Sequence, residues 1–179
     1  MSAPGFVLWF TGLPAAGKTT LARLCQDRLR ARGCAVVLLD SDELRAFLTP
    51  QPTYSPAERD WLYGVFGALA AWLAREGVNV LIAATANQRR YRDTARASIS
   101  RFAEVWVQCD PAVCRARDPK GIYARAATGQ APTVPGAGAD YEPPLNPEFQ
   151  IATDRFAPAD AADQLVEQLS ASGFIPPAI

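Results

Sequence analysis

The chain has 179 residues, a length typical of one domain, and its 18 basic and 18 acidic residues leave no net charge. A neutral chain has no broad attraction to nucleic acid or to a membrane surface, so neither is expected as a partner. There is no histidine to act as a general base, and the four cysteines show no metal-binding spacing. No signal peptide or bilayer-spanning stretch is evident, so we expect a cytoplasmic protein with reduced, mostly buried thiols.

A phosphate-binding loop is the first feature along the chain. An apolar run at residues 6–11 is typical of a buried parallel strand, and apolar residues at helical spacing begin at Thr19. In such a loop the backbone N–H groups surround phosphate oxygens, Lys18 reaches the β- and γ-phosphates as a catalytic residue, and Thr19 ligates Mg²⁺. The residues expected to bind ATP here are Gly12, Leu13, Pro14, Ala15, Ala16, Gly17, Lys18, Thr19 and Thr20.

An acidic cluster follows the second predicted strand, at residues 35–39. Asp40, Asp42 and Arg45 would stand at the same sheet edge as the phosphate loop. They supply a metal helper, a base and an anion clamp, which suits phosphoryl transfer because that reaction depends mainly on positioning and charge neutralisation. Alone, the cluster would indicate only a helix N-cap with a solvated acidic first turn. The third predicted strand, at residues 78–83, ends without a carboxylate, so Asp40 is the candidate for supporting Mg²⁺.

Helix and strand patterns alternate along the rest of the chain. Ser55, Pro56 and Glu58 form a capping box that begins a helix reaching about residue 76. The arginines of a later basic helix are interpreted as a mostly solvated face, and contact of Arg89 or Arg92 with the substrate is the alternative. The other predicted elements are strands at residues 104–109 and 149–153 and helices at residues 42–48, 89–100, 111–117 and 158–170. This order predicts an α/β fold of the P-loop NTPase type, with three α/β/α layers and a mostly five-stranded parallel sheet.

Residues 117–147 are predicted to form a lid or binding loop within a single domain that spans residues 1–179. Its first part is basic and contains Pro119 and Gly121 as hinges, and residues 128–147 are rich in Gly and Pro without periodicity. A lid would cover the triphosphate and exclude water. The alternatives are an exposed basic helix end for the first part and a disordered surface insertion for the second.

Together these motifs resemble the adenylylsulfate (APS) kinase family over nearly the whole chain. Besides the phosphate loop and the acidic cluster, residues 53–59 are similar to the family's Gly-Phe-Ser-x-x-Asp-Arg segment. Residues 117–123 and 141–148 resemble its Arg-Asp-x-Lys-Gly-Leu-Tyr and Tyr-Glu-x-Pro-x-Asn-Pro-Glu sequences, which are long and unusual. The resemblance implies a kinase that phosphorylates the 3′-hydroxyl of adenylyl sulfate, a small nucleotide substrate, with ATP and Mg²⁺, and it implies a homodimer.

The resemblance also implies roles for individual residues. Asp42 would be the base near the accepting ribose 3′-hydroxyl. Arg45 and Arg59 would hold the phosphosulfate group of the acceptor, and Tyr54 would stack on its adenine. Arg117 would lie over the adenine of ATP.

The acceptor half of the chain departs from the family pattern. Leu62 stands where the family has a substrate-binding asparagine, Ala86-Asn87-Gln88 replaces its Ser-Pro-Tyr, and Val134 replaces a stacking aromatic residue. The acceptor is therefore either adenylyl sulfate or another nucleotide-like molecule such as cytidine diphosphoramidate. A non-catalytic nucleotide-binding domain is a third alternative, which the intact Lys18 and Asp42 disfavour.

Overall fold

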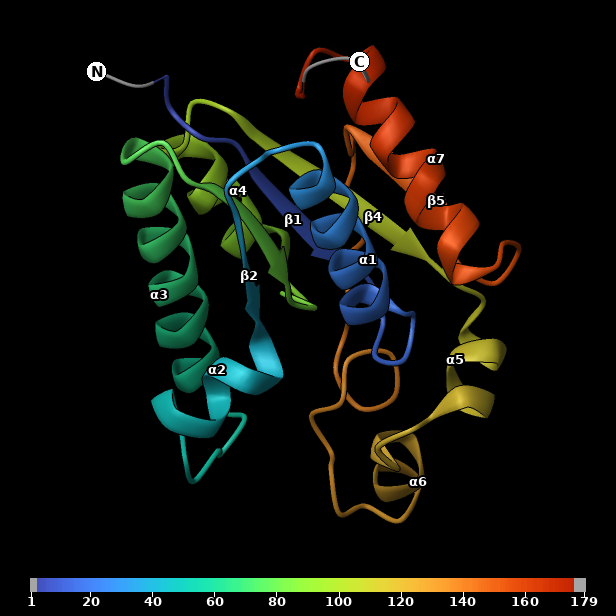
Figure 1. Ribbon diagram of the computed structural model, residues 1–179. Helices are drawn as coiled ribbons and strands as arrows, with labels where there is room; N and C mark the ends of the chain where they lie inside the picture. Colours follow the sequence, from blue (N-terminus) through green and yellow to red (C-terminus); the bar gives the residue numbers. More distant parts are fainter. Residues whose placement is uncertain (1–2, 176–179) are drawn as a thin grey trace.

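Five parallel strands form the centre of the structure, a computed structural model that describes residues 3–175. Their order across the sheet is β2 (Val36–Asp40), β3 (Asn79–Ala83), β1 (Val7–Thr11), β4 (Phe102–Gln108) and β5 (Phe149–Ala152). The strands are short and largely apolar because helices cover both faces of the sheet, as Figure 1 shows. The predicted three-layer α/β/α fold with a five-stranded parallel sheet is confirmed.

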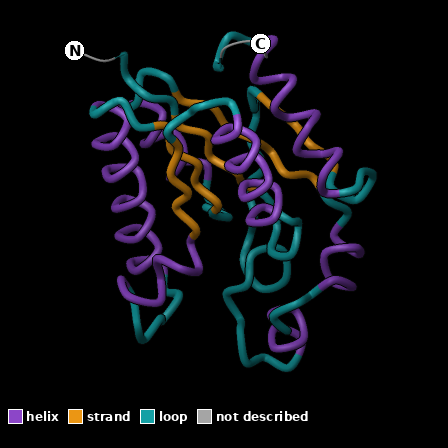
Figure 2. Tube along the Cα trace, in the orientation of Figure 1, coloured by secondary structure: helices purple, strands orange, loops and turns teal. Residues whose placement is uncertain are grey.

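Two pairs of helices cover the sheet. On one face α1 (Lys18–Ala31) packs against α7 (Pro158–Ala171), and on the other α3 (Pro56–Arg75) packs against α4 (Arg89–Ser98), as Figures 1 and 2 show. Three shorter helices lie toward the carboxyl ends of the strands: α2 (Ser41–Leu48), α5 (Pro111–Arg117) and α6 (Ile122–Ala127). None of the helices within residues 3–175 combines the length and the hydropathy that a membrane span requires.

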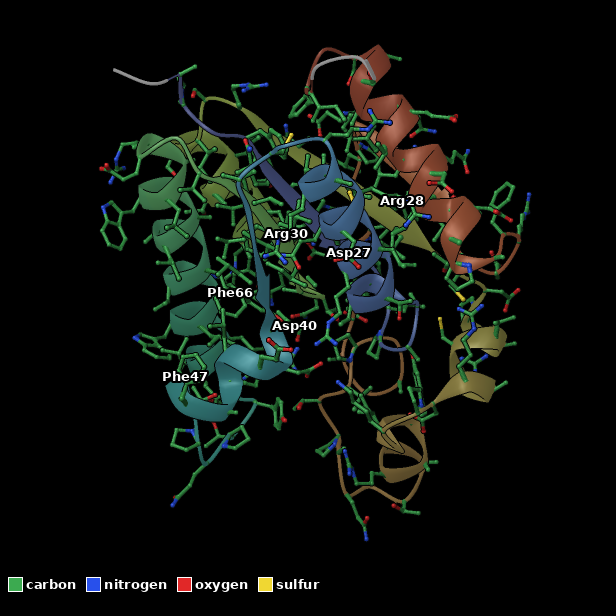
Figure 3. The ribbon with its side chains drawn as sticks, in the orientation of Figure 1. Asp27, Arg28, Arg30, Asp40, Phe47 and Phe66 are labelled. Atoms are coloured by element: carbon green, nitrogen blue, oxygen red, sulfur yellow. The ribbon has the colours of Figure 1, made fainter. Side chains whose placement is uncertain are left out.

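The central strand β1 separates two hydrophobic clusters. Successive strand residues point to opposite faces, so Leu8 joins the cluster under α1 and α7 whereas Trp9 joins the cluster under α3 and α4. Phe66 of α3 is fully buried in the second cluster, whereas Phe47 of α2 is 67% exposed (Figure 3). The core is thus built on both sides of the sheet and leaves its carboxyl edge free for polar residues.

The start of α3 differs in one detail from the predicted capping box. The Ser55 hydroxyl oxygen accepts a hydrogen bond from the Glu58 N–H at 3.2 Å, and Pro56 is the first helical residue. The Glu58 carboxylate does not return to the Ser55 N–H, however. It accepts from the Thr53 and Tyr54 N–H groups and from Arg45 instead. This carboxylate therefore ties α2 and the loop before α3 together.

The sequence did not predict α6, which lies inside the predicted lid. The Asp118 carboxylate caps its first turn by accepting from the N–H groups of Ile122 at 2.7 Å and Ala124 at 3.1 Å. Gly121 precedes the helix with a φ of 61°, in the left-handed region that glycine tolerates. The six-residue helix is too short for a periodic hydrophobic pattern, which explains why it was missed.

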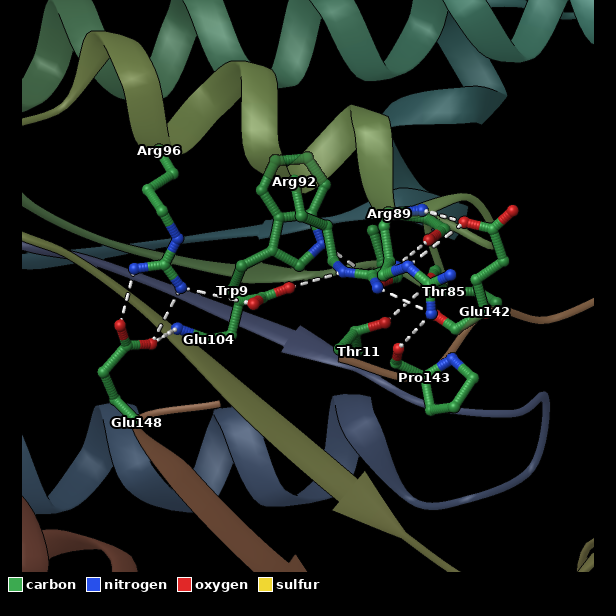
Figure 4. Close-up of polar contacts among 12 residues, drawn as sticks. Trp9, Thr11, Thr85, Arg89, Arg92, Arg96, Glu104, Glu142, Pro143 and Glu148 are labelled. Carbon is green, nitrogen blue, oxygen red and sulfur yellow. Dashed lines mark hydrogen bonds and ion pairs between the residues drawn. The ribbon is translucent and has the colours of Figure 1, made fainter. Parts of the chain in front are cut away.

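The interpretation of the basic helix as a solvated face is wrong for Arg92. This side chain of α4 is fully buried, and its Nε donates to the Glu104 carboxylate of β4 at 2.6 Å. Arg96 completes the network by pairing with Glu104 and with Glu148 (Figure 4). A buried guanidinium is tolerated because its charge is balanced and its N–H groups are hydrogen-bonded.

Candidate active site

The phosphate loop joins β1 to α1 at the carboxyl edge of the sheet. A Cβ atom at Gly12 would lie 2.4 Å from the carbonyl oxygen of Val107, so only glycine fits there. Gly17 has a φ of 91° and directly precedes Lys18, the first residue of α1. The loop therefore delivers its N–H groups and the positive end of a helix to one place, which is the arrangement that binds phosphate.

Lys18 is held within its own loop. Its ammonium group donates to the carbonyl oxygens of Gly12 at 3.1 Å and Leu13 at 2.8 Å. Burial lowers the pKa of Lys18 to about 8, although the nearby carboxylates of Asp42 and Asp40 oppose the shift. The ammonium is thus mostly charged at neutral pH. It lies within the loop that would hold the phosphate groups of a nucleotide.

Asp40 links the phosphate loop to the end of β2. It is 3% exposed, and its Oδ2 accepts from the Thr19 hydroxyl at 2.6 Å while its Oδ1 accepts from the Asp42 N–H at 2.8 Å. Asp40 is therefore the N-cap of α2, the alternative that the sequence left open, and a partner of the loop hydroxyl as well. A carboxylate and a hydroxyl side by side fit Mg²⁺, which takes oxygen ligands and keeps several of its waters.

A pocket of about 840 Å³ collects most of the residues predicted for the ATP, metal and catalytic sites, whereas Gly12, Leu13 and Ala16 are not part of its lining. Its lining includes Lys18, Thr19, Asp40, Asp42, Arg117 and Lys120. The volume is within the usual range for a small-molecule site. The pocket therefore brings together side chains from the phosphate loop, the end of β2 and the segment that follows α5.

Lys120 is a pocket residue that the sequence did not single out as a site residue. Its ammonium group forms an ion pair with Asp42, and both side chains are more than half exposed. This contact joins the predicted base to the predicted lid, because Lys120 lies between α5 and α6. The Asp42 carboxylate is thus within direct reach of a long cationic side chain from the predicted lid.

Arg117 and Thr153 close the other side of the pocket. The Arg117 guanidinium donates to the Thr153 carbonyl oxygen at 2.9 Å, and the Thr153 hydroxyl donates to the carbonyl oxygen of Ala16 at 2.6 Å. Thr153 therefore ties the end of β5 to the phosphate loop. Phe156 also lines the pocket and is 45% exposed. Neither Thr153 nor Phe156 belongs to a motif that identifies it from sequence alone.

The residues predicted to bind the acceptor form a second cluster at the start of α3. Arg45 pairs with Glu58 and lies over the Tyr54 ring, 4.8 Å from its centroid. Burial raises the pKa of Glu58, but hydrogen bonds from Thr53 and the Arg45 charge outweigh it and hold the pKa below its usual value. Glu58 is therefore ionised and neutralises Arg45.

Arg59 lies in the same cluster but has only neutral partners. Its side chain donates to the Tyr54 carbonyl oxygen at 3.2 Å, to Asn87 Oδ1 at 3.0 Å and to the Thr133 carbonyl oxygen at 2.6 Å. The residue is 8% exposed, and across residues 3–175 no carboxylate reaches it at ion-pairing distance. A buried cation without a counter-ion is costly, so this position suits an anionic ligand.

Tyr63 and Asn87 are members of the cluster that sequence reasoning missed. The Tyr63 hydroxyl lies against the Arg45 guanidinium and the Ala86 backbone, and burial raises its pKa although Arg45 and Arg59 oppose the change.

Two residues that replace family site positions, Leu62 and Val134, are instead buried in the hydrophobic clusters. Contacts between α3 and the loop after β3 create this site, and no local motif encodes them.

Comparison with known proteins gives consistent matches. Residues 4–152 match the protein family described as Adenylylsulphate kinase. The adenylyl-sulfate kinase of Rippkaea orientalis is 37% identical over 175 residues, which cover 98% of this chain and 97% of that protein.

Two solved structures extend the match to three dimensions. The APS kinase CysC of Mycobacterium tuberculosis, solved in complex with AMPPNP and APS, superposes with a TM-score of 0.87 at 31% identity and covers 93% of this chain and 98% of that chain. The hexameric APS kinase from Thiobacillus denitrificans superposes with a TM-score of 0.72 at 29% identity, over 99% of this chain and 31% of that chain.

Proposed function

This chain belongs to the adenylylsulfate kinase family, and we propose that it transfers the γ-phosphoryl group of ATP to the 3′-hydroxyl of adenylyl sulfate. The products are ADP and 3′-phosphoadenylyl sulfate. The observation that carries the proposal is the buried guanidinium of Arg59, whose partners are all neutral. An acceptor with a phosphosulfate group supplies the negative charge that Arg59 lacks.

The phosphate loop binds the donor. Lys18 exchanges its contacts with the Gly12 and Leu13 carbonyl oxygens for the β- and γ-phosphate oxygens of ATP. A positive charge placed there stabilises the transferring phosphoryl group, because its oxygens carry the charge of the transition state. Thr19 and Asp40 would hold Mg²⁺, which when bound neutralises further charge on the phosphates. Arg117 and Phe156, on the far side of the pocket, would enclose the adenine.

Asp42 is the base that orients the accepting hydroxyl and takes its proton. In the absence of the acceptor its carboxylate is paired with Lys120. Binding of the acceptor replaces part of that contact, and Lys120 then stays at the junction between donor and acceptor as a second cation. The segment 117–147, which carries Lys120, acts as the lid of a single kinase domain and keeps water from the triphosphate.

Arg45, Arg59 and Tyr54 bind the acceptor. The Tyr54 ring is 46% exposed, and Arg45 covers one of its faces. The adenine of adenylyl sulfate stacks on the other face, which contributes about 1–3 kcal/mol. Arg59 binds the phosphosulfate group, and Arg45, already neutralised by Glu58, mainly fixes the orientation of the ring.

The protein acts as a homodimer that associates through the exposed face of α3. Trp61 and Trp72 on this face are 50% and 55% exposed, and they lie about three helical turns apart on the same side. Gly64 and Ala68 lie between them, so the face carries little charge. Exposed tryptophans on a regular helix are typical of a protein–protein interface.

Arg59→Gln tests the role of the buried cation. The variant keeps an amide donor but removes the charge, and the KM for adenylyl sulfate should rise about 10- to 100-fold while the KM for ATP stays unchanged. Arg75→Gln, at the exposed end of the same helix, is the matched control and should behave like the wild type. An unchanged KM for adenylyl sulfate in Arg59→Gln would contradict the proposed acceptor site.

A further inference from the structure

Asn87 connects the acceptor arginine to the segment that follows α6. It is 6% exposed, and its Oδ1 accepts from Arg59 at 3.0 Å while its Nδ2 donates to the Asp140 carbonyl oxygen at 3.1 Å. Its own carbonyl oxygen accepts from the Glu142 N–H at 2.8 Å. One residue of the loop after β3 therefore contacts both α3 and residues 140–142.

The loop that carries Asn87 is fixed by side chains beneath it. Three successive carbonyl oxygens each accept a hydrogen bond: that of Ala84 from Trp9 Nε1 at 3.2 Å, that of Thr85 from the Thr11 hydroxyl at 2.7 Å and that of Ala86 from Arg92 (Figure 4).

Arg92 also binds the segment that faces this loop. Its guanidinium donates to the Glu142 carbonyl oxygen at 2.8 Å, while Glu104 balances its charge. The backbone on both sides of Asn87 is therefore held in place, and the Asn87 carboxamide presents its oxygen in a fixed direction.

Arg45 and Arg59, the two arginines proposed to bind the acceptor, differ in whether a carboxylate balances their charge. Arg45 is neutralised by Glu58, whereas Arg59 is held by an amide oxygen and two carbonyl oxygens. A neutral acceptor such as Asn87 orients a guanidinium without cancelling its charge. A guanidinium has five N–H groups, and these contacts use three of the five in Arg59.

We propose that Asn87 is a positioning residue for the anionic acceptor: its Oδ1 orients Arg59 and leaves the guanidinium charge for the phosphosulfate group. The proposal rests on the proposed function and adds to it a residue that stands where the family has proline. A carboxylate of the same shape at this position would retain the contact with Arg59 but would cancel the charge.

The test compares Asn87→Asp with Asn87→Ala. The first variant keeps the shape and the acceptor oxygen and adds a negative charge, whereas the second removes the contact and keeps Arg59 charged. The matched control is Asn79→Asp, at the start of β3. Asn79 likewise accepts through Oδ1, from the Phe6 N–H at 3.1 Å, and donates through Nδ2, to the Ala35 carbonyl oxygen at 2.9 Å.

Turnover is measured together with calorimetric binding of adenylyl sulfate in the presence of ADP. For Asn87→Asp, KM and Kd for adenylyl sulfate should rise about 10- to 100-fold, and for Asn87→Ala about 3- to 10-fold. The KM for ATP should not change in either variant, and Asn79→Asp should match the wild type. A purely structural asparagine predicts instead that the KM for ATP and the thermal stability change together with the Kd for adenylyl sulfate, because both variants lose the Nδ2 donation to the Asp140 carbonyl oxygen.

The role of Asn87 is overturned if Asn87→Asp binds adenylyl sulfate as well as the wild type, or if Asn87→Ala is the weaker binder of the two. If Asn87→Asp does not fold, Asn87→Ala is combined with Arg59→Gln. Their effects on Kd should then be less than multiplicative, and fully multiplicative effects overturn the role. A wild-type chain that binds adenylyl sulfate without phosphorylating it overturns the proposed function alone, and one that does neither overturns both.

Discussion

The Thr19 hydroxyl donates a hydrogen bond of 2.6 Å to Asp40, so the first turn of α1 and the end of β2 meet at one carboxylate oxygen. The other oxygen of Asp40 caps α2 through the Asp42 N–H. One residue therefore sets the position of the hydroxyl predicted to bind the metal and of the carboxylate predicted to be the base. This arrangement explains why the two acidic residues should respond differently to loss of charge.

Asp40→Asn should raise the Mg²⁺ concentration that gives half-maximal activity, because an amide is a weaker ligand for a hard cation than a carboxylate. The helix cap should survive, since Asn is also a good N-cap residue. Activity measured against Mg²⁺ at saturating ATP checks this. Asp110→Asn is the matched control, because Asp110 caps α5 through the Ala112 N–H at 2.7 Å and does not line the ATP pocket. An unchanged Mg²⁺ requirement in Asp40→Asn would contradict the assignment.

Asp42→Asn should lower kcat by about 10²–10⁴-fold with little change in the KM for ATP, which is the usual contribution of a general base. Steady-state kinetics with both substrates provides the measurement. Glu43→Gln removes the same charge from the next residue, which pairs with Arg23 at the surface, and should stay close to the wild type. If Asp42→Asn retains full turnover, another group takes the proton.

The lowered pKa of Lys18 predicts a pH dependence for ATP use. Because its pKa in the free enzyme is about 8, Lys18 is charged below that pH and becomes neutral above it. The value of kcat/KM for ATP should therefore be flat below about pH 8 and fall about tenfold per pH unit above it, since this parameter reports the free enzyme.

Lys18→Arg is the control for this profile, because arginine stays charged throughout the range. Whatever its absolute rate, the variant should lose the break near pH 8. A break that persists in Lys18→Arg would assign the titration to a different group.

Trp72→Glu should convert the proposed dimer into a monomer, because it places a charge within an apolar interface. Light scattering coupled to size-exclusion chromatography measures the mass directly. Leu145→Glu introduces the same charge at a residue that is 74% exposed in the loop between α6 and β5, and it should leave the dimer intact. A Trp72→Glu protein that keeps the mass of a dimer would place the interface elsewhere.

The phosphate loop and the mostly five-stranded parallel sheet could be predicted from the sequence because their signals are local. Gly12, Gly17 and Lys18 have a fixed spacing, and the alternation of apolar strands and amphipathic helices implies a parallel sheet. The acceptor cluster could be predicted only in part. Arg45 and Arg59 are part of recognisable motifs, whereas Asn87 acquires its role from contacts across 28 residues of sequence.

The buried state of Arg92 shows the same limit. The basic sequence of its helix indicates a solvated face. Only the packing of α4 on β4 brings Glu104 next to Arg92. Likewise, α6 depends on Asp118, which becomes a cap only after the chain turns at Gly121. Such side-chain caps and buried ion pairs arise from tertiary structure, so sequence periodicity does not reveal them.

The most direct test of the central claim is to identify the phosphorylated product after incubating the purified protein with ATP, Mg²⁺ and adenylyl sulfate. Mass spectrometry and ³¹P NMR should detect 3′-phosphoadenylyl sulfate in an amount equal to the ADP formed, and Lys18→Ala should abolish both. Parallel reactions contain cytidine and uridine diphosphate derivatives, including cytidine diphosphoramidate, as acceptors. Phosphorylation of one of these, with none of adenylyl sulfate at millimolar concentration, would contradict the proposed acceptor.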